Sequence, residues 1–501
     1  MKKELLHSLR KGSSLMIIAL VLLFASCAIG YHDDETFNSG VRDTQLESPD
    51  LQKGLVVKYT TSASGEERFK IEWPVVYGAG GYEFTLYNVD DPNNPVAIGT
   101  EKEIIDGCTV ERDRAEDTKY KVVVLALGNK ENNNTTATEA SERTFTTLVP
   151  MYKLIPSGTD LGVFFQENPI PNLADLSEEG EEPVREIAYD LESGGEYTMS
   201  ADIALKLTAL TIRGDKINRA KLKVTGNSSF ISDGAGFKLK WINMDMTDYS
   251  GKGFITYNAT QNTEALLPNG WIAIKESSQL VSCNITDLKK PILFDNGKKY
   301  GLFEFIFRDC VIQQNLSSND SFINFGTGVI KDTRMMYSTF YNKTQKEDTW
   351  IKYGNVQFDK LDHRPIADWT TAGFNIQNCT FWQIAYAKQI FNSNGFKRSA
   401  NYVTIENTIF VDCGKGEVTR RFLMGDRNPA RTFKQNTYWY KGSTPGEETK
   451  YDITKTHIDA DPQFKDPANG DFTVKGADQI GALTGDPRWL PVPVVEKNLE
   501  E

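Results

Sequence analysis

The chain has 501 residues, with 56 Lys or Arg against 68 Asp or Glu and a formal net charge of −12 at pH 7. This acidic balance disfavours electrostatic capture of a phosphate backbone, so no nucleic-acid partner is expected. The composition, with 39% hydrophobic residues and 27 Phe, is that of a folded chain with material for a large core.

The N-terminus has the pattern of an export signal. Four Lys or Arg side chains precede an apolar run over residues 15–24, which is too short to span a bilayer. Residues 1–26 are therefore predicted to be a secretory signal peptide. The sequence Phe24-Ala25-Ser26-Cys27 resembles a bacterial lipobox, and this resemblance implies that Cys27 is lipidated and begins the mature chain. A plain signal peptide that is cleaved elsewhere is the alternative.

Residues 27–50 are polar and predict a flexible linker. The linker contains His32-Asp33-Asp34-Glu35, which resembles the short acidic signal that directs some lipoproteins of polysaccharide-utilising Gram-negative bacteria to the outer-membrane surface. The resemblance implies a lipid-anchored protein exposed on the cell surface. An ordinary polar linker without an address is the alternative.

Cysteine usage argues against a disulfide framework. Lipidation of Cys27 leaves five cysteines, an odd number that cannot pair completely. They are Cys108, Cys283, Cys310, Cys379 and Cys413. The chain has four His and no Cys-x-x-Cys spacing, so no metal site is predicted.

Residues 51–149 show short alternating segments at 69–73, 82–87 and 120–126, separated by clusters of turn residues. This pattern predicts an antiparallel β-sandwich. The arrangement of Trp73, Tyr82 and Tyr120 resembles a fibronectin type III domain, which implies that Trp73 lies in the core and that Tyr120 forms the tyrosine corner. The module is expected to be a spacer, with a binding role as the alternative.

Residues 150–490 contain a repeat. Seven related segments share one equivalent position, and their spacings are 39, 27, 28, 41, 29 and 29 residues. The equivalent positions are Asn243, Ser282, Asp309, Tyr337, Asn378, Asn407 and Asn436. A second apolar segment follows in most units and no long amphipathic helix intervenes, which predicts a parallel β-helix with insertions in the first and fourth units. The handedness rule for parallel crossovers makes it right-handed.

The predicted fold is thus all-β, a sandwich followed by a β-helix. Residues 187–197 and 207–214 resemble the opening turns of the pectate-lyase-like superfamily, and residues 460–464, 469–472 and 485–489 resemble the closing segment of uncharacterised lipoproteins of that kind. Residues 491–501 are predicted to be a tail.

The repeat assigns structural roles to several conspicuous residues. Cys283, Cys310 and Cys379 share one position, with Met244, Ser338, Thr408 and Thr437 in the other turns. We expect an interior ladder of unpaired thiols, because parallel side chains on neighbouring strands do not face each other. The Asn residues one position earlier, at 243, 378, 407 and 436, are expected at a bend with left-handed backbone, which Asn tolerates.

Alternation from this ladder places an aromatic strip on the exterior. Phe340, Phe381, Phe410 and Trp439 are predicted to point inward. The aromatic strip consists of Tyr341, Trp382, Tyr438 and Tyr440. Their spacing from turn to turn is similar to that of sugars in a chain, and aromatic rings stack on apolar sugar faces, so these rings are candidate glycan-binding residues. The alternative is that an inserted loop, especially 355–373, covers the strip and makes it a second core.

A basic segment accompanies the strip. Residues 374–442 carry ten Lys or Arg against four Asp or Glu. Lys388, Arg420 and Arg421 are therefore candidates for binding an acidic polysaccharide, and an ordinary solvated face is the alternative.

The leading hypothesis is a surface lipoprotein that binds an acidic glycan, together with other glycan-uptake proteins and without a cofactor. The first alternative is a polysaccharide lyase with a Lys or Arg base, the only case in which Ca²⁺ is expected. However, the sequence shows neither a lyase motif nor carboxylates at equivalent positions for Ca²⁺, so no catalytic residue is assigned. The second alternative is an adhesin or a structural surface protein.

Overall fold

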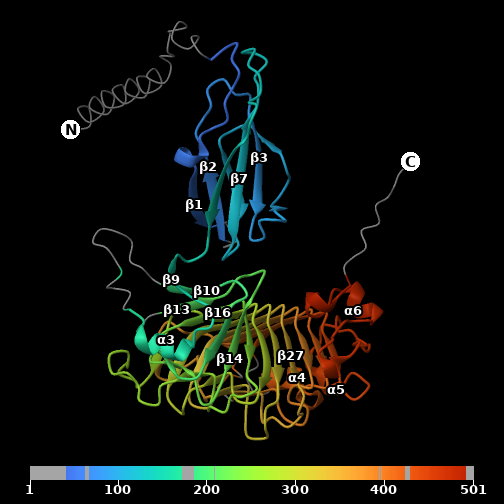
Figure 1. Cartoon of the computed structure of the whole chain (residues 1–501). Helices are drawn as coiled ribbons and strands as arrows, with labels where there is room; N and C mark the ends of the chain where they lie inside the picture. The colour runs from blue at the N-terminus through green and yellow to red at the C-terminus, as the bar shows by residue number, and fades with distance from the viewer. Residues whose placement is uncertain are drawn as a thin grey trace, which may run out of the picture. The chain divides into compact units, whose positions relative to one another are not determined.

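The computed structural model describes residues 41–61, 67–171, 176, 186–207, 209–393, 395–396, 398–423 and 429–491. Contacts divide the chain into two units, residues 1–148 and 149–501 (Figure 1). The predicted signal peptide, the lipidation site Cys27 and the acidic tetrapeptide lie outside the described residues.

The first unit contains two antiparallel sheets that enclose one hydrophobic core. One sheet consists of β1 (Val56–Thr61), β2 (Glu67–Glu72) and β6 (Thr109–Asp113). The other consists of β4 (Val96–Ala97), β3 (Tyr82–Asn88), β7 (Lys119–Ala126) and β8 (Ser141–Thr146), with β5 (Glu103–Ile105) against β3. The short helix α2 (Leu51–Gly54) precedes β1. Trp73 is buried in the core, and the buried Tyr120 donates its hydroxyl to the Ala115 carbonyl at 3.2 Å.

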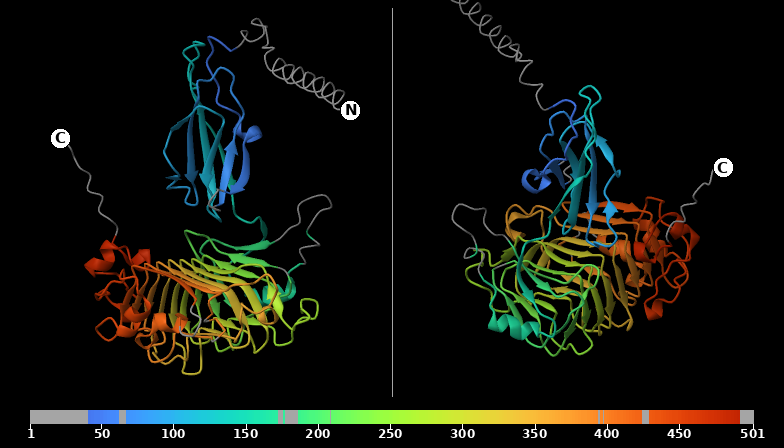
Figure 2. Two further views of the ribbon diagram at one scale, coloured as in Figure 1. Left: turned by 180° about the vertical axis from the view of Figure 1, so that it is seen from behind. Right: turned by 45° about the horizontal axis from the view of Figure 1, so that its top comes forward.

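The second unit is built from three parallel sheets in its described part, with strands that succeed one another around the coil (Figure 2). The eleven-stranded sheet contains β9 (Met151–Ile155), β10 (Ile187–Leu191), β13 (Leu210–Arg213), β16 (Phe237–Lys240), β19 (Ile272–Ile274), β20 (Ser278–Val281), β23 (Tyr300–Arg308), β26 (Val329–Met336), β29 (Gly373–Gln377), β32 (Tyr402–Glu406) and β34 (Ala430–Lys434). The nine-stranded sheet contains β11 (Glu196–Met199), β14 (Ala220–Val224), β17 (Ile242–Asp245), β21 (Asn284–Leu288), β24 (Val311–Gln314), β27 (Thr339–Asn342), β30 (Thr380–Trp382), β33 (Ile409–Val411) and β35 (Thr437–Trp439).

The seven-stranded sheet contains β12 (Ile203–Leu205), β15 (Phe230–Ser232), β18 (Ile255–Tyr257), β22 (Leu293–Phe294), β25 (Ile323–Phe325), β28 (Ile351–Tyr353) and β31 (Phe391–Asn392). The chain visits the three sheets in turn, an arrangement consistent with the predicted parallel β-helix. Short helices flank the coils: α3 (Leu161–Glu167), η2 (Leu361–His363), η3 (Gly414–Gly416), α4 (Val418–Leu423), α5 (Gly446–Tyr451), η4 (Pro467–Asn469), α6 (Ala477–Gly481) and η5 (Pro487–Trp489).

A bend of one left-handed residue leads from the eleven-stranded sheet into the nine-stranded sheet. It lies at Trp241, Ser282, Asp309, Tyr337, Asn378, Asn407 and Gln435. The prediction of left-handed Asn residues was therefore correct for Asn378 and Asn407. It was wrong at the two ends, because Trp241 and Gln435 occupy the bend instead of Asn243 and Asn436. The bend therefore does not require Asn.

The residue after each bend points into the core. This ladder consists of Ile242, Cys283, Cys310, Ser338, Cys379, Thr408 and Asn436, so Met244 and Thr437 do not belong to it. The five described cysteines outside the N-terminal segment are free, as predicted. The Cys310 thiol lies 3.3 Å from the carbonyls of Leu280 and Arg308, and burial raises its pKa.

Stacked rings fill the interior beside this ladder. Phe340, Phe381 and Phe410 stack with centroid separations of 5.1 and 4.8 Å and nearly parallel planes. Tyr438 continues the stack at 5.8 Å from Phe410. The predicted inward orientation is thus confirmed for the three Phe residues. At the last coil the prediction was wrong by one residue, because Tyr438 points inward where Trp439 was expected.

Candidate glycan-binding surface

Two residues of the predicted aromatic strip, Tyr341 and Trp382, lie on the outer face of the nine-stranded sheet, but they are covered. Tyr341, Trp382 and Trp439 share one outward row with Val411. The closing segment 460–490, here called the C-terminal cap, packs its apolar side chains on this row. The ring centroid of Phe472 lies 5.1 Å from that of Tyr341 and 6.1 Å from that of Trp382. Tyr341 is only 7% exposed, and this half of the strip is a second core.

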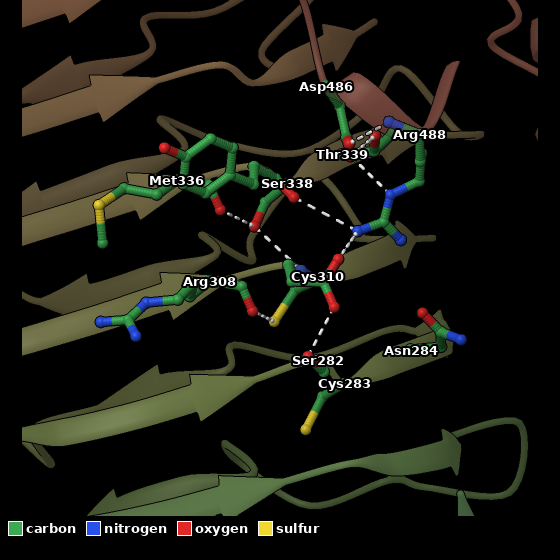
Figure 3. A network of polar contacts seen from close by, with 12 residues as sticks. Ser282, Cys283, Asn284, Arg308, Cys310, Met336, Ser338, Thr339, Asp486 and Arg488 are labelled. Atoms are coloured by element: carbon green, nitrogen blue, oxygen red, sulfur yellow. Dashed lines mark hydrogen bonds and ion pairs between the residues drawn. The ribbon is translucent and has the colours of Figure 1, made fainter. Parts of the chain in front are cut away.

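Polar contacts fix the C-terminal cap on the neighbouring outward row of threonines (Figure 3). The carboxylate of Asp486 accepts from Thr339 Oγ1 at 2.7 Å, and the Asp486 backbone N–H donates to Thr380 Oγ1 at 3.0 Å. Asp486 is 1% exposed, and burial raises its pKa although nearby Arg488 opposes the shift. Arg488 bridges Asp486 at 2.9 Å and Asp309 at 2.5 Å, so the cap is also tied to a bend between two sheets.

The segment that covers the strip is not the inserted loop 355–373. Within that loop, Trp369 packs on Phe303 of β23, with ring centroids 6.0 Å apart. The carbonyls of Arg364 and Pro365 accept from Asn269, which lies in the other insertion. The two insertions thus contact each other beside the eleven-stranded sheet.

The remaining predicted residues are separated from one another. Tyr438 is buried in the interior stack, and its hydroxyl donates to Asp452 at 3.1 Å. Tyr440 follows the last strand and is half-buried beside Tyr386. Lys388 is exposed on the loop that carries Tyr386. Tyr440 and Lys388 therefore lie outside the covered part of the strip.

Arg420 and Arg421 lie on α4, where Glu417 pairs with both. The distances are 2.9 Å from Arg420 Nη1 and 2.6 Å from Arg421 Nη2 to the Glu417 carboxylate oxygens. This carboxylate compensates the positive charge that the sequence suggested for a glycan. The excess of basic residues in 374–442 indicated Arg420 and Arg421 as candidates, but the sequence did not show that Glu417 pairs with both.

The open part of the same outer face lies over the first four strands, β11, β14, β17 and β21. A groove of about 700 Å³ runs across them. Two rows of outward side chains line it, one residue of each row per strand. One row is Glu196, Lys221, Asn243 and Asn284, and the other is Thr198, Lys223, Asp245 and Thr286. We call these eight residues the polar groove.

The polar groove offers both donors and acceptors to solvent. Lys221 and Glu196 pair at 3.1 Å but remain 65% and 75% exposed. Asn284 donates to Asn243 Oδ1 at 2.9 Å, while its own Oδ1 is buried and has no hydrogen-bond partner among the described residues. The backbone N–H and hydroxyl of Thr247 hydrogen-bond to Asp245 and lower its pKa. Because neighbouring strands repeat at about 4.8 Å, the groove presents a similar pair of polar groups at each step along the coil.

None of the eight outward residues of the polar groove is aromatic, so the aromatic pattern in the sequence did not indicate it. Alternating polar residues in 196–198, 221–223 and 243–245 were the available signal. Among the described residues, no group of three or more His, Cys, Asp or Glu side chains is placed to hold a metal ion. Within the same part of the chain, no helix has the length and apolarity required to cross a membrane.

Three family models match the chain. Residues 1–194 match DUF4992, residues 195–343 match DUF4957 and residues 374–489 match DUF5123, and each is described as a domain of unknown function. No curated protein and no solved structure shows significant similarity to the chain.

Proposed function

We propose that the protein is a lipid-anchored, cell-surface polysaccharide-binding protein of the outer membrane and that the polar groove holds the glycan. The observation that carries this proposal is the open groove on the outer face of four successive strands. An extended polysaccharide repeats hydroxyl groups along its length, and the groove repeats hydrogen-bonding groups along the coil. This correspondence favours a linear chain that runs along the coil axis.

The energetics of the polar groove are suitable for reversible glycan binding. Each hydrogen bond to a neutral group contributes about 1 kcal/mol, so several bonds over four strands are needed for useful affinity. Lys221 and Lys223 can act without backbone movement, because they project from β14, which is paired with a strand on each side. A rigid row of this kind loses little conformational entropy on binding.

The N-terminal part of the chain supports the proposed location on the cell surface. The lipobox-like sequence at Cys27 provides the anchor, and we propose that the first unit is a fibronectin type III-like spacer. The contact between the Tyr120 hydroxyl and the Ala115 backbone supports this assignment, since a tyrosine corner joins such a hydroxyl to the backbone a few residues upstream.

Affinity electrophoresis of the full chain tests the proposal, with gels that contain dextran, xylan, alginate or polygalacturonate. Lys223→Ala/Asn284→Ala should weaken retention by the retarding polysaccharide roughly three- to tenfold, because it removes donors from two of the four strands under the groove. Lys206→Ala is the control, since Lys206 is exposed and does not line the groove. Equal retention of wild type and double variant would refute the assignment of the groove. Unsaturated products detected by ultraviolet absorbance would instead identify a lyase.

A further inference from the structure

Two tyrosines and two lysines form a second surface cluster at the C-terminal end of the coil. They lie on the loops that follow β30, β33 and β35. The cluster, here called the tyrosine–lysine site, consists of Tyr386, Lys415, Tyr440 and Lys441. Tyr440 donates its hydroxyl to the Tyr386 carbonyl at 3.1 Å, and the ring centroids are 5.8 Å apart. The Lys441 ammonium lies 5.6 Å from the ring centroid of Tyr386 and 5.2 Å from that of Tyr440.

The backbone of this site is held in an unusual conformation. Gly414, Lys415 and Gly416 are all left-handed, with φ of 57°, 61° and 71°. Lys441 is left-handed as well, with φ of 51°, and its N–H donates to Asp412 Oδ1 at 2.9 Å. Left-handed backbone at a residue with a long side chain is unfavourable and persists only where the surroundings impose it. The loops are therefore built to place these two lysines.

Close packing explains how the conformation is imposed. A Cβ atom on Gly416 would lie 2.9 Å from Pro445 Cγ and 3.1 Å from Tyr440 Cδ1. The loop of Lys415 consequently lies directly against the Tyr440 ring. Gly414 N–H donates to the Ile384 carbonyl at 3.0 Å, which ties the same loop to the one that carries Tyr386. The three loops thus form one connected structure.

The charges of the site are not neutralised. Lys415 and Lys441 are exposed, and neither has a carboxylate within ion-pair distance among the described residues. Arg420 and Arg421, a few residues from Lys415, share Glu417 instead. The Tyr386 hydroxyl also has no hydrogen-bond partner in the described part of the chain. The site therefore offers two free cations and a phenol donor beside aromatic rings.

We propose that the tyrosine–lysine site binds the anionic groups of an acidic polysaccharide, either uronate carboxylates or sulfate esters. This inference rests on the proposed glycan-binding function and specifies the charge of the glycan. Lys415 and Lys441 bind the anionic group, the Tyr386 hydroxyl hydrogen-bonds to a neighbouring sugar oxygen, and the rings contact the apolar sugar face. The tyrosine–lysine site recognises an anionic sugar unit, while the polar groove, whose outward side chains include both Lys and acidic residues, binds the polymer through hydrogen bonds.

The test uses the full chain in affinity gels that contain polygalacturonate, dextran sulfate or neutral dextran. Lys415→Ala/Lys441→Ala should weaken retention in at least one anionic gel roughly three- to fivefold, from two exposed ionic contacts, and leave retention in dextran unchanged. The matched control is Lys434→Ala/Lys455→Ala, which removes the same charge from exposed positions outside the site. Tyr386→Phe should produce a smaller loss in the same gel, because it removes only the hydroxyl.

Each outcome decides the proposal. If Lys415→Ala/Lys441→Ala weakens retention only in polygalacturonate gels, the ligand is a carboxylate. If it weakens retention only in dextran sulfate gels, the ligand is a sulfate ester. If the test and control variants lose equal retention, only the net charge matters and the proposed site is wrong. Unchanged retention would overturn it as well. If a neutral glycan alone retains the wild type and the groove variant abolishes this retention, the ligand is not acidic. The proposed function would then stand, and the tyrosine–lysine site would be rejected.

Discussion

Asp486 Oδ2 accepts a hydrogen bond from Thr339 Oγ1 at 2.7 Å, although 147 positions separate the two residues in the chain. Trp489 Nε1 donates to the same hydroxyl at 2.8 Å. Through these contacts the C-terminal cap closes over the outer face of the last coils. The outer face of the nine-stranded sheet is consequently divided between the rings covered by the cap, which stabilise the fold, and the open polar groove on earlier strands.

Removal of one apolar side chain of the C-terminal cap should destabilise the second unit. Phe472 is fully buried between Tyr341, Trp382 and Trp489. Phe472→Ala should lower the free energy of unfolding by about 3–5 kcal/mol, measured by chemical denaturation, because it leaves a cavity. Tyr77→Ala is the control, since Tyr77 is 78% exposed. An unchanged denaturation midpoint for Phe472→Ala would contradict the packed cap.

The interior thiols should resist alkylation in the native protein. Burial raises the pKa of Cys283 to about 11 and also raises that of Cys310 and Cys379, which lowers the fraction of reactive thiolate. Mass spectrometry after brief iodoacetamide treatment should find these three unlabelled and the half-buried Cys108 labelled first. All should react after denaturation. Rapid native labelling of two of the three would reject the register of the coil.

Stability should fall as the pH rises toward neutrality because of Glu347. This buried carboxylate accepts from the Ala385 backbone N–H and the Asn342 side chain, yet burial raises its pKa from 4.5 to about 7. The folded state therefore binds more protons than the unfolded state between these values. The free energy of unfolding contributed by this group is fully present below about pH 4.5 and decreases by about 3 kcal/mol by about pH 7.

Glu347→Gln tests this dependence, because the amide cannot titrate. Urea denaturation at about pH 4.5 and about pH 7.5 should show a smaller difference for the variant than for the wild type. Glu139→Gln, at an exposed position, should retain the wild-type difference. An identical difference in Glu347→Gln would assign the pH dependence to other groups.

The anchor prediction concerns Cys27. Without its thiol the chain cannot be acylated, so Cys27→Ser should move the protein from the membrane fraction to the soluble fraction in fractionated cells. Cys108→Ser is a suitable control, because it removes a thiol from the first unit. A Cys27→Ser protein that remained with the outer membrane would exclude lipidation as the means of attachment.

Local periodicity was sufficient to predict the coil but not its ends. Bends at Ser282, Asp309, Tyr337, Asn378 and Asn407 follow from the regular spacing of the inner units. At the last unit, Gln435 occupies the bend instead of Asn436, so the prediction shifted Tyr438 and Trp439 by one residue. Asn favours left-handed backbone only weakly, so the presence of Asn436 did not fix the register of the last unit.

The covered strip could not be predicted for a different reason. Alternation correctly placed Tyr341 and Trp382 on the outer face, but it contains no information about segments that pack there later in the chain. The only signal was the apolar content of a segment without strand pattern, namely Phe464, Phe472 and Trp489. Such side chains require a partner surface, and the strip is the partner in this fold.

The position of the C-terminal cap also has a consequence for biosynthesis. Coils form in order as the chain emerges, since each strand pairs with its predecessor, whereas the cap is synthesised only after the coils on which it packs. Until then, Tyr341, Trp382 and Val411 face water. A chain terminated before the cap would therefore display an apolar surface that the finished protein hides, and proteases would distinguish the two.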